Sequence, residues 1–161
     1  MSSFPCDVEF EVVRETWNEY RLSDGAKLRT KLILGKVISP PGIPPDRAME
    51  YSFNTQTMVI AYVPQEMKGT PSGRIMTPQD IQNAIIEDLD YEQTKVAVNE
   101  YMLENGVRIK LRLMLTHVGK TNQFTPDGSP LYGVSTQIVP EIKLPSNLLK
   151  KGPTSTRTPI V

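Results

Sequence analysis

The feature that most constrains this chain is an internal repeat. The stretch "NEYRLSDGAKLRTKLILGKV" at residues 18–37 returns as "NEYMLENGVRIKLRLMLTHV" at residues 99–118, an offset of 99 − 18 = 81 positions. The alignment of residue i with residue i+81 needs no gap from residue 18 to residue 64, and it extends to "YSFNTQ" and "YGVSTQ". Two unrelated hairpins of similar composition would match only locally, so we interpret the pattern as a duplicated structural unit.

Each copy of the repeat opens with a β-hairpin. The turns at residues 23–25 ("SDG") and 104–106 ("ENG") contain Asp-Gly and Asn-Gly, the strongest short-range hairpin signals. A two-residue loop would set Leu22 opposite Lys27 and mix apolar with charged side chains on one face. A three-residue loop with glycine in the left-handed conformation sets Leu22 opposite Ala26 instead. Because this register separates apolar from charged residues, we expect three-residue loops in both copies.

A third strand follows each hairpin, at residues 51–63 in the first copy and 132–144 in the second. Pro140 falls inside the second of these strands, and a proline cannot donate a hydrogen bond to a neighbouring strand, so we expect that strand to be an edge or bulged strand. The alternating residues 7–17 at the start of the chain predict one added strand that runs into the first hairpin.

A helix is predicted between the two copies. Thr77 is placed to cap it, Pro78 suits the first helical position, and Asp80 occupies the capping-box position. Apolar residues then recur at helical spacing, which predicts a helix over 78–89. These apolar residues are Ile81, Ala84, Ile85 and Leu89.

The predicted fold is mainly β: two tandem three-stranded repeats packed as a pseudo-two-fold barrel or sandwich, with one connecting helix near 78–89. A three-stranded sheet has one apolar face and is marginally stable alone, so a second copy would cover it. Residues 1–150 are expected to form a single domain, with repeats at about 8–70 and 95–150. The Pro-, Ser- and Thr-rich residues 151–161 are expected to form a flexible tail. Strand order, and exchange of hairpins between repeats, are left open by the sequence.

Composition and motifs favour a protein without catalytic residues. The net charge is zero, Cys6 and His117 are the single cysteine and histidine, and no phosphate loop, dinucleotide fingerprint or zincin motif occurs. The chain shows no signal peptide and no apolar run long enough to span a membrane. We therefore expect a soluble, cytoplasmic, non-enzymatic protein with no cofactor and no metal.

Several acidic residues also fit structural roles better than catalytic ones. Asp46 and Asp127 recur at equivalent positions, each after a proline, where aspartate caps a turn. The carboxylates of Glu87, Asp88 and Asp90 are expected on the solvated end of the predicted helix, without the glycine of a calcium loop.

The clearest candidate binding site is formed by lysine and arginine residues that alternate along one strand of each copy. They lie on one face of a strand in each copy, beside an aromatic side chain, and such stripes could bind the phosphates of a nucleic acid or another polyanion. An ordinary solvated sheet face explains the same pattern, because sheet surfaces commonly carry lysine and arginine. The residues are Lys27, Arg29, Lys31, Arg108, Lys110, Arg112 and Trp17.

The leading functional hypothesis is a non-enzymatic β-repeat protein that acts through protein contacts, as an assembly subunit or adaptor, with a protein partner or self-association at its strand edges. The first alternative is a nucleic-acid or polyanion binder, and the second is a small-ligand or enzyme site at the repeat interface. That interface site would be lined by polar residues repeated in both copies: Tyr51, Gln56, Tyr132 and Gln137.

Overall fold

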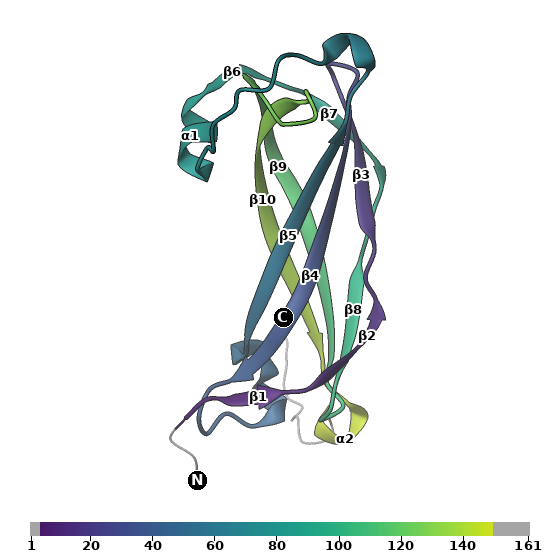
Figure 1. Ribbon diagram of the computed structural model, residues 1–161. Coiled ribbons are helices and arrows are strands. Elements are labelled where there is room, and N and C mark those ends of the chain that lie inside the picture. The colour runs from purple at the N-terminus through teal and green to yellow at the C-terminus, as the bar shows by residue number, and fades with distance from the viewer. Residues whose placement is uncertain (1–3, 150–161) are drawn as a thin grey trace, which may run out of the picture.

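The structure is a computed structural model that describes residues 4–149. It confirms a mainly β fold, built from two five-stranded antiparallel sheets (Figure 1). Sheet A contains β5 (Ser52–Tyr62), β4 (Lys27–Ser39), β3 (Trp17–Leu22) and β7 (Tyr91–Lys95) in that order, with β1 (Cys6–Val8) paired to the end of β4. Sheet B contains β10 (Pro130–Lys143), β9 (Arg108–Phe124), β8 (Asn99–Leu103) and β2 (Phe10–Arg14), with β6 (Ile85–Asp88) paired to β9.

Each repeat contributes five strands, where the sequence predicted three. The offset of 81 residues relates β2 to β7, β3 to β8, β4 to β9 and β5 to β10. It also aligns β1 with the end of β6. The prediction of one added strand at 7–17 was therefore wrong in detail, because the chain breaks at Glu9 into β1 and β2, which join different sheets.

The second strand of each repeat is exchanged between the sheets. β2 of the first repeat pairs with β8 in sheet B, and β7 of the second repeat pairs with β3 in sheet A. Two asparagines at equivalent positions hold the crossings: the Thr16 backbone N–H donates to Asn99 Oδ1 at 3.1 Å, and the Ala97 N–H donates to Asn18 Oδ1 at 2.8 Å. The repeats therefore exchange strands and not hairpins.

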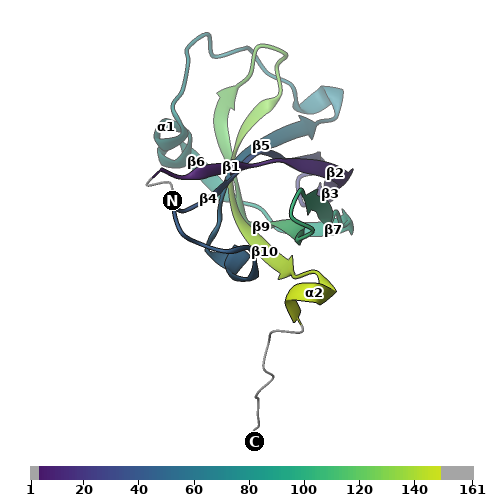
Figure 2. The ribbon, with the colours of Figure 1, turned by 90° about the horizontal axis from the view of Figure 1, so that it is seen from below.

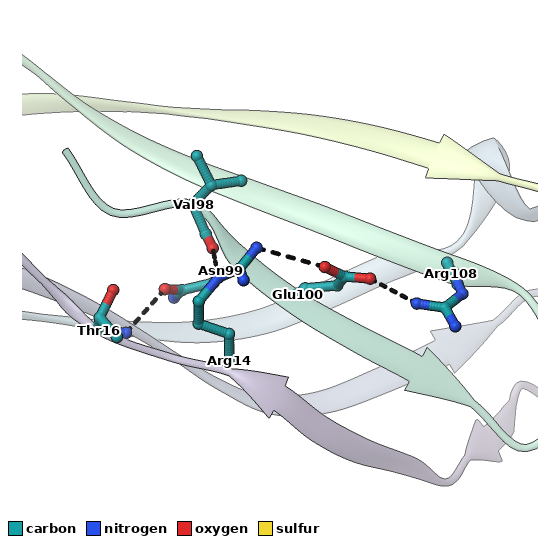
Figure 3. A network of polar contacts seen from close by, with 6 residues as sticks. All are labelled: Arg14, Thr16, Val98, Asn99, Glu100 and Arg108. Atoms are coloured by element: carbon teal, nitrogen blue, oxygen red, sulfur yellow. Dashed lines mark hydrogen bonds and ion pairs between the residues drawn. The ribbon is translucent and has the colours of Figure 1, made fainter.

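Arg14 at the end of β2 fastens this exchanged strand to the second repeat (Figure 3). Its Nε donates to the Val98 carbonyl at 3.0 Å, and its guanidinium lies 3.4 Å from a Glu100 carboxylate oxygen. The other Glu100 oxygen accepts from Arg108 at 2.6 Å, so this one carboxylate joins β2, β8 and β9.

Two apolar cores lie between the sheets, and the repeat offset relates one to the other. Each core combines the hairpin of one repeat with residues near the end of the long second hairpin strand of the other repeat. In an end-on view the strands of both sheets lie around a common centre (Figure 2). The equivalent pairs in the two cores are Tyr20/Tyr101, Leu22/Leu103, Ala26/Val107, Leu28/Ile109, Leu34/Leu115, Val37/Val118, Val8/Leu89 and Tyr51/Tyr132.

The hairpin predictions are confirmed. Gly25 and Gly106 have φ of 95° and 88°, and the registers set Tyr20 opposite Leu28 and Tyr101 opposite Ile109. A left-handed glycine after a two-residue turn is what the three-residue loop requires. One face of each hairpin is therefore apolar and buried, while the other carries the charges.

The connecting helix is shorter than predicted. α1 spans Pro78–Asn83 and has the expected capping box between Thr77 and Asp80, but residues 85–88 form β6. Ile85 packs closely over Gly119 and Gly133, which are paired across β9 and β10, so that a side chain at either glycine would collide with it. This tertiary contact overrides the local helical pattern, and the carboxylates expected on the helix end lie on or next to β6 instead.

The remaining elements are short. Two 3-10 helices, η1 (Pro45–Glu50) and η2 (Gln65–Met67), flank β5, and a single helical turn, α2 (Ser146–Leu149), follows β10. Among the residues that the structure describes, no helix has the length and apolar character needed to cross a membrane. The predicted tail at 151–161 lies outside the described residues.

Candidate interaction edge

Six of the described strands pair with a single neighbour and so present an edge to solvent. Four of these edges are short, with three to five residues, and each carries at least one charged side chain. Short length and charge are two common ways in which proteins prevent edge strands from pairing with other chains. The other two edges are the long strands β5, with 11 residues, and β10, with 14 residues.

The two long edge strands run in opposite directions (Figure 1). Val59 and Ala61 near the end of β5 line a hollow of about 490 Å³ together with Tyr132 near the start of β10. Met49 of η1, just before β5, lines a second hollow of about 440 Å³ with Ile142 near the end of β10. The repeat offset relates these two hollows, because each lies between the end of one long edge strand and the segment that leads into the other.

β10 is a protected edge. Its register with β9 shifts at Pro130/Tyr132 and again at Ser135/Thr136. It also carries Pro140, Glu141 and Lys143 near its end. Bulges, proline and charge each discourage an added strand, so the expectation that Pro140 marks an edge or bulged strand is confirmed.

β5 shares the second of these register shifts, at Asn54/Thr55, but it carries neither the proline nor the charges of β10. From Thr55 to Tyr62 it pairs with β4 in one unbroken register, and its sequence "SFNTQTMVIAY" contains no charge and no proline. From Met58 to Tyr62 its side chains are apolar, and three of them are exposed: Met58 is 40% exposed, Val59 43% and Tyr62 51%. A long, straight, uncharged and apolar edge is a template for another β-strand.

The predicted cations of the first repeat lie on the outer face of sheet A. Lys27 and Arg29 both pair with Glu19, at 3.3 and 3.5 Å. The Arg29 guanidinium stacks 4.5 Å from the centre of the Trp17 ring, and the Lys31 ammonium lies 5.5 Å from it. The tryptophan is therefore already covered by its own cations, and Glu19 offsets part of their charge.

The equivalent cations of the second repeat lie on the outer face of sheet B, because they alternate with residues buried in the shared core. Arg108 pairs with Glu100, while Lys110 and Arg112 make no ion pair within the described residues. The two cationic stripes therefore point away from one another and do not form one continuous surface.

The two repeated tyrosines reach the opposite repeat. The Tyr132 hydroxyl donates to Asp24 Oδ2 at 2.7 Å, and the Tyr51 hydroxyl accepts from Asn105 Nδ2 at 3.3 Å. Lys120 lies 3.4 Å from Asp24 Oδ2. Burial raises the pKa of both tyrosines, and the bond to the Asp24 carboxylate raises the pKa of Tyr132 further. These protonated hydroxyls join the repeats.

The two repeated glutamines do not accompany the tyrosines. Gln56 and Gln137 are exposed on β5 and β10, away from the contacts between the hairpin turns and the tyrosines. The residues that sequence analysis missed are Val59 and Ile60. Their signal lies in the alignment, where they stand opposite Pro140 and Glu141, because the first repeat lacks the proline and the charge that protect the second.

Comparison of the chain with protein-family models, with curated proteins and with solved structures gave no match.

Proposed function

We propose that this chain is a protein-binding module, an assembly subunit or adaptor, whose edge strand β5 pairs with an extended strand of a partner. The observation that carries the proposal is the unbroken, uncharged edge from Thr55 to Tyr62, whose last five residues are apolar. In such β-augmentation, main-chain hydrogen bonds supply affinity and alternate side chains supply specificity. The neighbouring hollow beside Val59 and Ala61 gives the partner's side chains a place to pack.

The polyanion alternative has weaker support. Glu19 holds two of the cations on sheet A and Glu100 holds one on sheet B. Each stripe faces a different direction, so a single strand of nucleic acid cannot lie along both.

A small-ligand site at the repeat interface would use Tyr132, but its hydroxyl is already hydrogen-bonded to Asp24.

The second repeat provides a matched variant for a test. Pro140 and Glu141 stand at the positions equivalent to Val59 and Ile60, and they pair with the same positions of the neighbouring strand: Pro140 with Leu111 where Val59 pairs with Thr30. The double variant Val59→Pro/Ile60→Glu thus gives β5 the protection that β10 tolerates, so it is expected to fold.

The test is a selection of extended random peptides on the immobilised protein, with this double variant as counter-selection. We expect peptides rich in β-branched and aromatic residues, which slow hydrogen exchange of the β5 amides when they bind. Val12→Glu on the short edge β2, where Val12 is 54% exposed, is the control that should retain binding. Peptides that bind the double variant equally well, or that protect amides elsewhere, would overturn the proposal.

A further inference from the structure

We infer that the strand which β5 binds is β5 of a second copy of this chain, so that two A sheets join into one antiparallel sheet. Five strands from each copy would give ten in all. This inference rests on the proposed function, because it names the occupant of the same edge. The argument has three parts: the outward backbone groups, the pairing of side chains and the size of the contact.

The equivalent proline identifies which backbone groups of β5 point outward. Prolines within sheets occur where the missing N–H would face solvent and not a neighbouring strand. Pro140 occupies the ladder position of Val59, so we infer that the Val59 N–H points away from β4. The backbone N–H and C=O groups of successive residues point to opposite sides of a strand. Those of Thr55, Thr57 and Ala61 therefore point to the same open side as those of Val59.

A two-fold axis at Thr57 then gives β5 a self-complementary register. Thr57 would face its own copy, Val59 would face Thr55, and Ala61 would face Phe53. Pairs of β-branched and aromatic side chains are favourable across antiparallel strands. No charged residue lies on β5, so no like charges meet across the axis. On the other face of the sheet, Met58 would pair with Gln56, Ile60 with Asn54 and Tyr62 with Ser52.

The size of the contact fits a reversible dimer. An edge of 11 residues is roughly 36 Å long, and it is the only part of each subunit that this contact uses. Specific interfaces of standard size bury about 800 Å² per partner, and smaller ones are typical of weaker complexes. A contact made by one 11-residue edge is smaller than this standard size, so the dimer is expected to be weak and to dissociate on dilution.

The first measurement is the concentration dependence of mass by light scattering on the full chain. We expect the wild type to rise from the 18.1 kDa of one chain toward twice that mass. The Val59→Pro/Ile60→Glu variant should dimerise at least about thirtyfold more weakly, the effect of losing one interface hot spot. The Val12→Glu control should match the wild type, and circular dichroism should show that all three proteins are folded.

A second measurement tests the register, and it does not depend on a disruptive variant. In a Cys6→Ser background, Thr57→Cys places one thiol beside the axis, where the two Cα atoms would lie about 5.5 Å apart, a separation that a disulfide spans. We expect this variant to form an intermolecular disulfide on mild oxidation. Ile138→Cys, at the equivalent position of β10, is the matched control and should stay largely uncrosslinked.

The outcomes separate this inference from the proposed function. A wild type that stays monomeric at high concentration overturns the homodimer, while the peptide selection still decides whether β5 binds another protein. A dimer that survives the β5 double variant, or that crosslinks through residue 138 as readily as through residue 57, also overturns it. A dimer lost in the double variant and crosslinked at residue 57 supports it.

Discussion

β5 and β10 are equivalent strands of the two repeats, yet their open edges differ in proline and charge content. Both form the outer edge of a five-stranded sheet, and both begin their straight segment with Thr-Gln, at Thr55 and Thr136. Beyond that point β10 reads "IVPEIK" and β5 reads "TMVIAY". The second repeat thus carries a proline and two charges where the first carries only uncharged residues, and an edge without such residues is open to another strand.

The difference shows what a duplicated fold can change independently. The two cores use equivalent residues from both repeats, because the end of β4 packs into the core of the second hairpin and the end of β9 packs into the core of the first. A change in one core position therefore affects both repeats. The outer edges pair only with their own neighbours, so β5 and β10 can diverge without disturbing the cores.

The largest expected effect comes from removing the protection of β10. The triple variant Pro140→Val/Glu141→Ile/Lys143→Tyr gives β10 the residues of β5, so each molecule would have two open edges. Contacts at two different edges allow open-ended growth instead of a closed dimer. We expect large oligomers or fibres, measured by light scattering and by thioflavin fluorescence.

The same triple variant combined with Val59→Pro/Ile60→Glu provides the control for this prediction. It exchanges the two edges and leaves one open edge per molecule, so it should return to a discrete dimer. If the triple variant instead keeps the mass of the wild type, the residues from Pro140 to Lys143 do not protect β10.

Equivalent core positions should have equal effects if the repeats differ only at their edges. Leu28 and Ile109 are both 0% exposed, so alanine at either position should lower the free energy of unfolding by about 3 kcal/mol. Urea denaturation followed by circular dichroism measures both. The exchanged strands β2 and β7 should keep unfolding in one transition. Two separate transitions would show that the repeats unfold independently.

The repeat, the hairpins and their registers could be predicted from the sequence because their determinants are local. Asp24-Gly25 and Asn105-Gly106 specify the turn, and alternation of apolar and charged residues specifies the face. The mainly β fold follows from the same signals. The strand boundaries at 85–95 could not be predicted, because Ile85 adopts a strand to pack over Gly119 and Gly133, a contact that only the folded structure reveals.

The candidate edge was only partly predictable. The sequence predicts contacts at strand edges and an edge or bulge at Pro140, but the exposure of Val59 depends on sheet order. The cationic stripes were predicted from alternation, and the structure places them on strands as expected. Their separation onto opposite faces follows from the packing of sheet A against sheet B, which a linear pattern does not contain.

A smaller effect on stability is expected from replacing the two tyrosines. The hydroxyl of Tyr132 bonds to a charged carboxylate, while that of Tyr51 bonds to a neutral amide. Tyr132→Phe removes the 2.7 Å bond to the Asp24 carboxylate and should lower the free energy of unfolding by about 2 kcal/mol. Tyr51→Phe removes a neutral bond to Asn105 and should cost about 1 kcal/mol. Urea unfolding of both variants measures the difference. Equal costs would show that Lys120 already satisfies Asp24.

The smallest effect is a difference in alkaline sensitivity. The pKa of Tyr132 is raised in the folded state, first by burial and then by its bond to Asp24, so the folded protein holds this proton more tightly than the unfolded chain. The unfolded chain loses the proton first as pH rises above about 10, the ordinary pKa of tyrosine, and stability then falls. We expect the urea midpoint to drop between about pH 9 and about pH 11, with a smaller drop in Tyr132→Phe. Lysines also lose protons in this range, but they are shared by both proteins, so the difference between the two slopes reports on residue 132. Identical slopes would mean that the hydroxyl of Tyr132 is not held by the first repeat in solution, and would remove one of the contacts that join the repeats.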